Sequence, residues 1–238
     1  YVMVKYNGTN EKVKLQITCP DQSCYTYLIS DRGAYDTFPL TAGNGSYALQ
    51  VLENVAGDTY TVSLAQSINV SIEDEFLPFL YPNQYVNFHT DSKAVSKGSD
   101  LAKDTYSDLD VVQNIYNYVI KNISYDTEKA QNVSYGYVPD IDDTLSSKKG
   151  ICFDYAALMT SMLRSQNIPT KLEVGYSGDA YHAWISTYID DKGWVDDIIQ
   201  FNGDSWQIMD PTLAATNDSA AVKKYVGDGS HYVVKYTY

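Results

Sequence analysis

No stretch of about 18 or more apolar residues occurs in this sequence, so it predicts no membrane-spanning helix. Positive charge is also scarce, because 17 Lys and Arg residues face 30 Asp and Glu residues and leave a formal net charge of -13. Binding to phosphate groups needs a basic surface, so we expect neither nucleic acid nor an anionic membrane as a partner. We interpret the acidic excess as a source of solubility.

The sequence has three cysteines and three histidines, which limits the chemistry that the chain can carry. Cys19 and Cys24 enclose a short segment near the N-terminus, and a disulfide between them and two free thiols in a turn both remain open. Cys152 stands far from both. No Cys-x-x-Cys pair or similar ligand spacing occurs, so we predict no metal site. We also predict no cofactor, because chemistry at a cysteine thiol requires none.

The 238 residues, 44% of them hydrophobic, suffice for one large domain or two small ones. Up to residue 75, apolar and polar positions alternate in short runs separated by turn-forming residues, a pattern typical of β-strands. These runs are 2–4, 13–17, 25–29, 47–51 and 60–64. We therefore predict a small all-β, sandwich-like module at 1–75 that is structural, is adhesive or frames a cleft, followed by a second domain at 76–238.

The second domain combines helices and strands, so the chain as a whole is predicted to be α+β. After a connection at 76–90, apolar residues at helical spacing predict helices at 92–103, 108–121 and 152–165. Residues 122–149 show no clear period, and residues 135–143 within them suggest a surface loop. Strand-like runs follow at 171–176, 182–188, 194–198, 206–209 and 231–238.

Three carboxylates in the predicted loop, Asp140, Asp142 and Asp143, raise the question of calcium. They lack the central glycine and the closing glutamate of a calcium-binding loop, so we interpret them as solvated acids. The position of the loop directly before Cys152 favours a place at the rim of a cleft.

The strongest functional signal comes from Cys152 in Gly-Ile-Cys-Phe-Asp-Tyr, His182 in Tyr-His-Ala-Trp and Asp210 in Met-Asp-Pro-Thr. Cys152 is predicted at the first turn of a helix, where unpaired N–H groups favour a thiolate and can bind an oxyanion. His182 can take the thiol proton and return it to a leaving group. Asp210 can accept the second ring N–H of His182 and hold the productive tautomer. Each residue alone would equally fit an ordinary structural role.

Nearby residues are predicted to support this arrangement. Gly150 lets the chain approach the first turn of the helix closely. Asp154 is interpreted as a stabilising charge at the helix N-terminus. Trp184 shares a strand face with His182, where it either shields the imidazole or packs in the core.

The three motifs in this order resemble the transglutaminase-like superfamily, which shares its Cys–His–Asp arrangement with papain-like thiol proteases. The resemblance runs from about residue 125 to residue 212. It implies a papain-like, transglutaminase-like core in which the helix bearing the cysteine packs on an antiparallel β-sheet. It also implies that Cys152 is the nucleophile, His182 the base and Asp210 the orienting acid, and it makes Tyr125 a candidate for a second oxyanion donor.

We therefore expect a thiol-dependent enzyme that transfers acyl groups from amide bonds of proteins or peptides through a thioester. Hydrolysis, as in a cysteine protease, and transfer to an amine, as in a transglutaminase, both remain open. The alternative is a non-catalytic protein- or glycan-binding module at a cell surface, which the 23 tyrosines and the acidic charge would suit. Related bacterial surface proteins imply an extracellular or cell-surface location. Because the chain begins with Tyr1, we expect an upstream segment outside this sequence.

Overall fold

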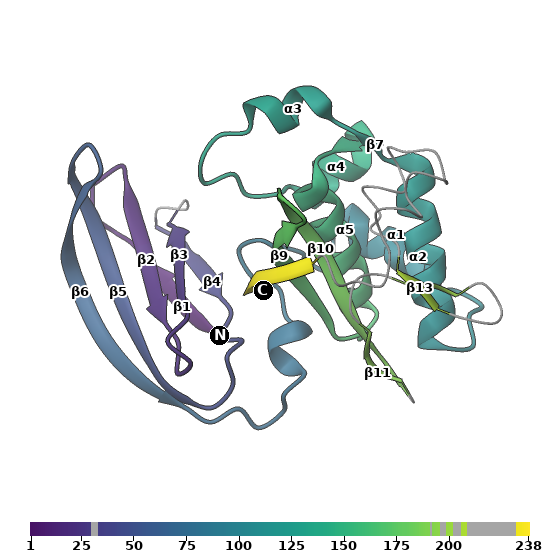
Figure 1. Cartoon of the computed structure of the whole chain (residues 1–238), viewed down its shortest axis with the longest axis horizontal. Helices are drawn as coiled ribbons and strands as arrows, with labels where there is room; N and C mark the ends of the chain where they lie inside the picture. The colour runs from purple at the N-terminus through teal and green to yellow at the C-terminus, as the bar shows by residue number, and fades with distance from the viewer. Residues whose placement is uncertain (30–32, 191, 196–198, 202–205, 209–231) are drawn as a thin grey trace. The chain divides into compact units, whose positions relative to one another are not determined.

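The computed structural model describes residues 1–29, 33–190, 192–195, 199–201, 206–208 and 232–238 (Figure 1). The chain divides into two compact units, Tyr1–Pro78 and Phe79–Tyr238. The assignment of domains to 1–75 and 76–238 stays a prediction. Among the helices in the described ranges, none is both long enough and apolar enough to cross a bilayer.

The first unit consists of β-strands in two antiparallel sheets. In the smaller sheet, β1 (Val2–Lys5) pairs with β4 (Tyr35–Phe38). The larger sheet has the order β3 (Cys24–Leu28), β2 (Val13–Thr18), β5 (Gly45–Ala56) and β6 (Thr59–Val70). The rings of Tyr27 in β3 and Phe38 in β4 lie 4.8 Å apart, and both side chains are buried, so the sheets share a core.

The five strands predicted in this unit are present. The sequence analysis missed a sixth strand, β4, and predicted β5 and β6 to be shorter than they are. β4 has 4 residues, too few for a recognisable alternation. β5 and β6 each have 12 residues, because their pairing continues beyond the apolar alternation that marked their centres. Gly57 links them with a φ of +54°, a left-handed conformation that favours glycine.

The second unit holds the predicted long helices, α1 (Lys93–Ala102), α2 (Asp108–Asn122) and α5 (Cys152–Ser165). A short 3-10 helix, η1 (Leu77–Phe79), precedes them. An antiparallel sheet has the order β11 (Gly193–Val195), β10 (Ala180–Ile189), β9 (Thr170–Ser177) and β14 (Tyr232–Thr237). Two further pairs are the antiparallel β12 (Ile199–Phe201) with β13 (Trp206–Ile208) and the parallel β7 (Ser124–Tyr125) with β8 (Lys149–Gly150).

Helix α5 lies at the centre of this unit (Figure 1). It contacts β9 and β10 on one side and α1, α2 and α4 on the others. Every residue from Asp154 to Arg164 is buried, so the helix has no solvent-facing stripe after its first turn. The predicted α+β core, with the helix bearing Cys152 on an antiparallel sheet, is confirmed.

Arg164 shows how the far end of α5 is held. Its guanidinium is buried and donates hydrogen bonds of 2.7–2.8 Å to the backbone carbonyls of Tyr81, Thr170 and Tyr238. Burial lowers the pKa of Arg164 to about 9. One side chain thus joins the helix to β9, to the end of the chain and to the segment before α1, which limits movement of the helix that carries Cys152.

The predicted surface loop at 135–143 was wrong for its last three residues, which begin a helix, and the region 122–149 holds more regular structure than its lack of a period indicated. This region contains α3 (Thr127–Asn132) and α4 (Ile141–Ser147), which are too short to display a helical period. The carboxylate of Asp140 caps α4 by accepting the N–H groups of Asp142 and Asp143. Asp142 accepts the backbone N–H groups of Lys93 and Ala94 and so caps α1. Two of the three supposedly solvated acids are therefore helix caps.

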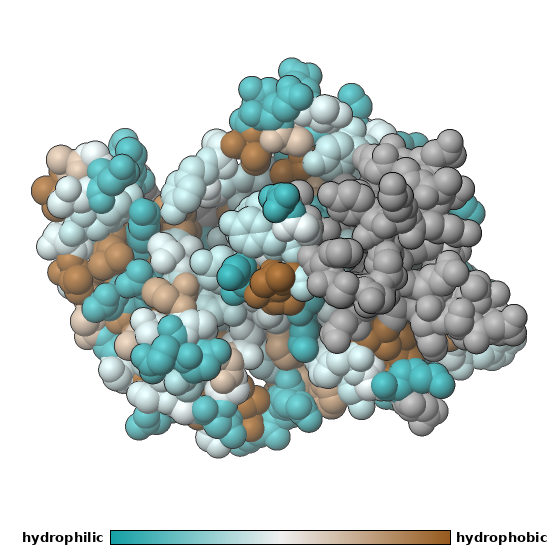
Figure 2. Space-filling view, in the orientation of Figure 1, coloured by the Kyte–Doolittle hydropathy of each residue, from teal (hydrophilic) through white to brown (hydrophobic). Residues whose placement is uncertain are grey.

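The face shown in Figure 2 carries hydrophilic and intermediate residues over most of its area, with hydrophobic residues scattered among them. The acidic charge of the sequence agrees with this appearance.

Candidate active site

Cys152 is the first residue of α5 and is partly exposed. The helix begins here because Ile151 is extended, with φ −94° and ψ 175°, and because its backbone N–H donates to the carboxylate of Asp154 at 2.8 Å. The helical ladder starts at Tyr155, whose N–H donates to the carbonyl of Ile151. The N–H groups of the first turn therefore have no acceptor within the helix, and they lie beside the thiol.

Gly150 is needed in this turn because of Asp154. A Cβ at position 150 would lie 2.7 Å from the Cβ of Asp154, closer than two carbons can approach. The sequence predicted that Gly150 permits a close approach of the backbone. The neighbour that leaves no room for a side chain at this position is the buried Asp154.

His182 lies in β10, directly opposite Gly175 of β9. A side chain at Gly175 would overlap the carbonyl oxygen of Val233 in β14, so the strand next to His182 presents no side chain at that register position. Trp184 is buried, and its ring lies 6.3 Å from the imidazole and 4.9 Å from the ring of Tyr232. Burial and the contact with Tyr232 support core packing for Trp184, and the contact with the imidazole agrees with shielding.

Cys152 and His182 line one pocket, whose volume is about 340 Å³. The sulfur comes from the start of α5 and the imidazole from β10, two elements that pack against each other. Two of the three residues that the sequence hypothesis requires to converge thus line the same pocket. The assignment of catalytic roles to the two residues stays a prediction.

Most of the lining residues that the structure describes in this pocket are aromatic or apolar. Its described lining includes no Asp, Glu, Lys or Arg, and it includes Tyr85, Tyr125, Tyr137, Phe153, Tyr181 and Tyr238. Burial raises the pKa of Tyr85 to about 12, with added repulsion from Tyr135 and Tyr181. Burial also raises the pKa of Tyr181, with smaller effects from Tyr236, Tyr176 and Cys152. Their hydroxyls are therefore neutral near pH 7 and can donate hydrogen bonds.

Tyr125, the candidate oxyanion donor, also lines this pocket. It lies in β7, where it pairs with Gly150 of β8, two residues before Cys152. A two-residue parallel bridge thus brings the tyrosine next to the start of α5. Its role as a donor stays a prediction.

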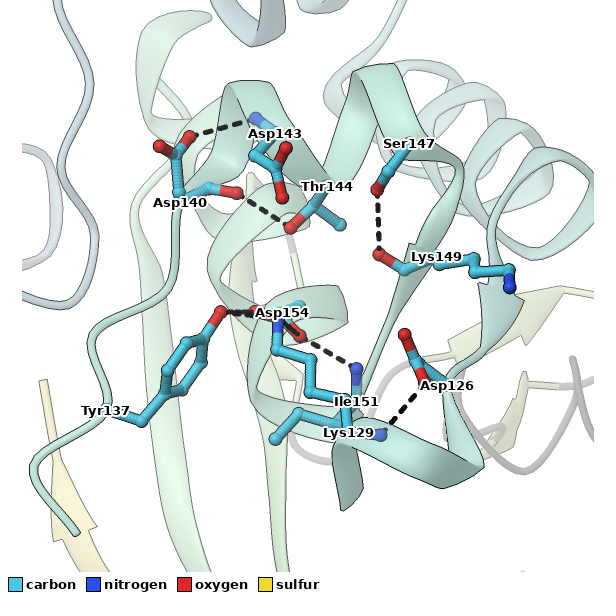
Figure 3. A network of polar contacts seen from close by, with 10 residues as sticks. All are labelled: Asp126, Lys129, Tyr137, Asp140, Asp143, Thr144, Ser147, Lys149, Ile151 and Asp154. Carbon is cyan, nitrogen blue, oxygen red and sulfur yellow. Dashed lines mark hydrogen bonds and ion pairs between the residues drawn. The ribbon is translucent and has the colours of Figure 1, made fainter. Parts of the chain in front are cut away.

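Asp154 is the centre of a polar network beside the pocket (Figure 3). Its carboxylate is fully buried and accepts three hydrogen bonds, from Lys129 Nζ at 2.7 Å, from the Tyr137 hydroxyl at 2.6 Å and from the Ile151 N–H at 2.8 Å. Lys129 Nζ also lies 2.6 Å from the Tyr137 hydroxyl. We call these groups the Asp154 network. The predicted role of Asp154 at the helix N-terminus is thus one part of a larger arrangement.

The network changes the titration of its members. Burial alone would lower the pKa of Lys129, but its hydrogen bonds and its attraction to Asp154 outweigh burial and raise the pKa. Burial, followed by the hydrogen bond to Asp154, raises the pKa of Tyr137 to about 12. Near neutral pH the network therefore holds an ammonium group and a neutral phenol against one carboxylate.

Lys129 and Tyr137 were not identified from the sequence. They precede Asp154 by 25 and 17 residues, and neither belongs to a motif with that residue. Their partner is set by the path of the chain through α3, for which the sequence showed no period. Asp210, the predicted orienting acid, lies outside the described residues.

Metal binding was not predicted, and no cluster of three or more potential metal ligands occurs among the residues that the structure describes. Cys19 and Cys24 are free thiols, one buried and one exposed. Their positions explain why the two thiols do not pair. Cys24 lies opposite Thr18 in the β2–β3 hairpin, whereas Cys19 is the next residue after Thr18 and faces the core on the other side of the sheet. Of the disulfide and the two free thiols considered for this pair, the structure therefore favours the free thiols.

Residues 96–196 match the family model of the transglutaminase-like superfamily. The UPF0252 protein MJ1282 of Methanocaldococcus jannaschii is 32% identical over 98 residues, which cover 36% of this chain and 28% of that protein. The Kyphoscoliosis peptidase of Mus musculus is 30% identical over 107 residues, which cover 40% of this chain and 16% of that protein. The chain therefore spans less than a third of the length of either curated relative.

Among solved structures, a candidate cysteine protease from Cytophaga hutchinsonii aligns with 99% of this chain and 78% of its own length, at 14% identity and a TM-score of 0.48. The family match includes α5 with Cys152 and the strand with His182, which are the two motifs found together in the pocket. The resemblance to the transglutaminase-like superfamily is therefore confirmed for the segment from residue 96 to residue 196, which matches the family model.

Proposed function

We propose that this protein is a thiol-dependent enzyme that transfers acyl groups from amide bonds of proteins or peptides. The observation that carries the proposal is the presence of Cys152 and His182 in one pocket, with the thiol at the first turn of α5. A nucleophile, a base and unpaired backbone N–H groups then lie together, as covalent catalysis by a thiol requires.

The proposed reaction has two stages. The sulfur of Cys152 attacks the amide carbonyl carbon while His182 takes the thiol proton. The C–N bond then breaks, and His182 returns the proton to the departing amine, which leaves a thioester on Cys152. In the second stage, water or a second amine attacks the thioester, the C–S bond breaks and the thiol is restored. Asp210 is proposed to orient His182.

The first-turn N–H groups of α5 are proposed to stabilise the negative oxygen that forms in each stage. Tyr125 is proposed as the second donor, because its side chain lines the same pocket. Replacing Tyr125 with Phe keeps the ring and removes the hydroxyl. Loss of one oxyanion donor is expected to lower kcat by about 10²-fold or more.

The name of the Mus musculus relative describes a peptidase, which supports the hydrolytic form of the reaction. Hydrolysis and transfer to an amine share the thioester and differ in the group that resolves it. The alternative of a non-catalytic binding module would not need a thiol and an imidazole in one pocket, so we do not favour it.

A labelling experiment tests the nucleophile directly, and the chain supplies its own reference thiol. Iodoacetamide is applied at about pH 6, and the alkylation of Cys152 and of the exposed Cys24 is followed by mass spectrometry. We expect Cys152 to react at least about tenfold faster, and this advantage to disappear in His182→Ala. Equal rates at the two cysteines would contradict the proposal.

The outcome of the reaction is tested with a peptide library, with and without an added primary amine. Hydrolysis gives cleaved peptides or deamidated glutamine, whereas transfer gives an amine-modified product of higher mass. Cys152→Ala is the control and is expected to abolish both. Product formation that survives in this variant would exclude the proposed mechanism.

We also propose an extracellular or cell-surface location, which rests on the resemblance to exported bacterial proteins. Labelling of intact cells with a membrane-impermeant reagent tests it, because an exposed protein is modified without lysis. Modification that requires lysis would contradict this location.

A further inference from the structure

One wall of the pocket has an unusual construction. It consists of α3 and the residues that follow it, up to Tyr137, which we call the 127–137 segment. This segment contributes four residues to the pocket lining, namely Ala130, Val133, Ser134 and Tyr137. Yet α3 has 6 residues, and none of them is buried. A helix of this length does not persist in water by itself, so other contacts must hold the wall in place.

The contacts that hold it are polar and meet at Asp154. Lys129 reaches the carboxylate from within α3, and Tyr137 reaches it from the end of the segment. Lys129 Nζ also lies 4.4 Å from the centre of the Tyr137 ring, so the two residues contact each other as well. The segment is therefore joined to α5 at both ends, as Figure 3 shows.

Burial makes this attachment strong. The Asp154 side chain is fully buried, whereas 26% of the Lys129 side chain is exposed. A buried carboxylate is stable when charged or hydrogen-bonding partners satisfy it, and removing one partner leaves a costly unmet charge. Two of its three hydrogen-bond donors, Lys129 and Tyr137, come from the 127–137 segment. Asp154 is also only two residues from Cys152, so the wall is fixed relative to the thiol.

We propose that Lys129 and Tyr137 are positioning residues, which hold the 127–137 segment against the start of α5 as a substrate-contacting wall. The described lining, which has no Asp, Glu, Lys or Arg, indicates what this wall contacts. A charged side chain would lose its hydration there and find no opposite charge among the described lining residues, so an apolar or aromatic part of the substrate fits best. The part of this inference that concerns substrate contact rests on the proposed function. The attachment of the 127–137 segment to α5 does not depend on it.

The test compares Lys129→Met and Tyr137→Phe with the unaltered chain. A matched control is Lys97, which lies 5.4 Å from the ring of Tyr118 and pairs at 3.8 Å with Asp100, a carboxylate that is 70% exposed. Lys97→Met and Tyr118→Phe therefore remove the same chemical groups from an arrangement whose carboxylate is exposed and not buried. Lys129→Arg retains the positive charge and is the rescue variant.

Hydrogen exchange followed by mass spectrometry measures the attachment without any need for activity. We expect exchange in the 127–137 segment to rise about tenfold or more in Lys129→Met and Tyr137→Phe, with α5 unchanged after its first turn. Lys129→Arg and both control variants are expected to match the unaltered chain. Unchanged exchange in both Lys129→Met and Tyr137→Phe would overturn the proposal, even if the protein proves to be an active enzyme.

Steady-state kinetics with an aromatic peptide substrate measures the consequence for binding. We expect KM to rise about tenfold in Lys129→Met with kcat changed by less than about threefold, because the wall contacts the bound substrate and not the reacting bond. An equal fall of kcat and kcat/KM would show that these residues act in the chemical step instead. If the unaltered protein shows no turnover, the proposed function fails, and the exchange experiment still decides whether the attachment exists.

Discussion

The two walls of the pocket beside Cys152 are held by different kinds of interaction. The α5 wall belongs to a helix that is buried from Asp154 to Arg164 and packs against a sheet and three helices. The 127–137 segment includes a helix with no buried residue, and polar contacts to Asp154 join it to α5. Close packing resists small displacements, whereas a few hydrogen bonds can open locally. The proposed nucleophile thus lies on a wall held by close packing, and the proposed substrate contacts lie on a wall held by one buried polar joint.

The largest expected effect follows from disturbing the packed wall. Leu158 lies in the middle of α5 and is fully buried. Leu158→Ala removes apolar contacts and leaves a cavity, so we expect the free energy of unfolding to fall by about 2–5 kcal/mol. Urea denaturation followed by circular dichroism measures the change.

Ala130→Gly is the comparison variant, because it weakens α3 in the other wall. A glycine in a helix costs about 1 kcal/mol where the helix contributes to global stability, and less where it does not. We expect its effect on unfolding to be clearly smaller than that of Leu158→Ala. Comparable losses in the two variants would mean that both walls belong to one cooperative core.

A smaller effect is expected from Asp154→Asn, which alters the joint between the two walls. The amide retains an oxygen for the Ile151 N–H but removes the charge that partners Lys129. We expect a loss of about 1.5–3 kcal/mol in the free energy of unfolding. Faster hydrogen exchange in the 127–137 segment should accompany this loss.

Asp100→Asn provides the reference for that experiment. Asp100 forms an exposed ion pair with Lys97 in α1, and such pairs contribute about 1 kcal/mol or less. Denaturation curves of Asp154→Asn and Asp100→Asn should therefore separate clearly. A loss at Asp154 no larger than the loss at Asp100 would show that the buried network is energetically unimportant.

The smallest and most local effect is expected at alkaline pH. The pKa of Tyr137 is about 12 in the folded chain, above its ordinary value of 10.0, and the pKa of Lys129 is also raised, from 10.5. Both groups therefore contribute stability fully below about pH 10, and the contribution is lost as the pH rises through their folded values. We expect the stability difference between the unaltered chain and Tyr137→Phe to shrink between about pH 9 and pH 12.

Denaturation at a series of pH values measures this difference, and ultraviolet absorbance follows tyrosine ionisation. Ionisation of other buried tyrosines, such as Tyr85 with a pKa of about 12, also destabilises the protein in this pH range. These tyrosines are present in both proteins, so the difference in the free energy of unfolding between the unaltered chain and Tyr137→Phe reports on Tyr137 alone. A constant difference across this pH range would show that the environment of Tyr137 in the fold is not the one described.

The packed wall was predictable because its signals are local. The spacing of apolar residues from Ala156 to Leu163 predicts a helix, and Gly150 before Cys152 indicates where the helix begins. The alternation around His182 likewise predicts a strand. The polar wall was missed because α3 is too short to show a period, and because Lys129 and Tyr137 find their shared acceptor through the path of the chain.

The same contrast applies to single side chains. Asp142 was interpreted as a solvated acid, yet it caps α1, whose N-terminus is about fifty residues away in sequence. Arg164 is basic and would be expected at the surface, but three backbone carbonyls from separate segments surround it. The backbone groups that Asp142 and Arg164 bind belong to distant parts of the chain, so no local sequence pattern predicts these contacts.

The sequence by itself determined five of the six strands of the first unit and the long helices of the second, and it marked Cys152 and His182 as candidates for catalysis. Periodicity, turn residues and helix-start signals act over a few neighbouring residues, and these features need nothing more. The tertiary structure alone decided that the thiol and the imidazole line one pocket, that its lining is aromatic, and that Asp154 joins its two walls. Such facts depend on which distant segments are brought into contact, and burial and hydrogen bonding across the whole fold select those contacts.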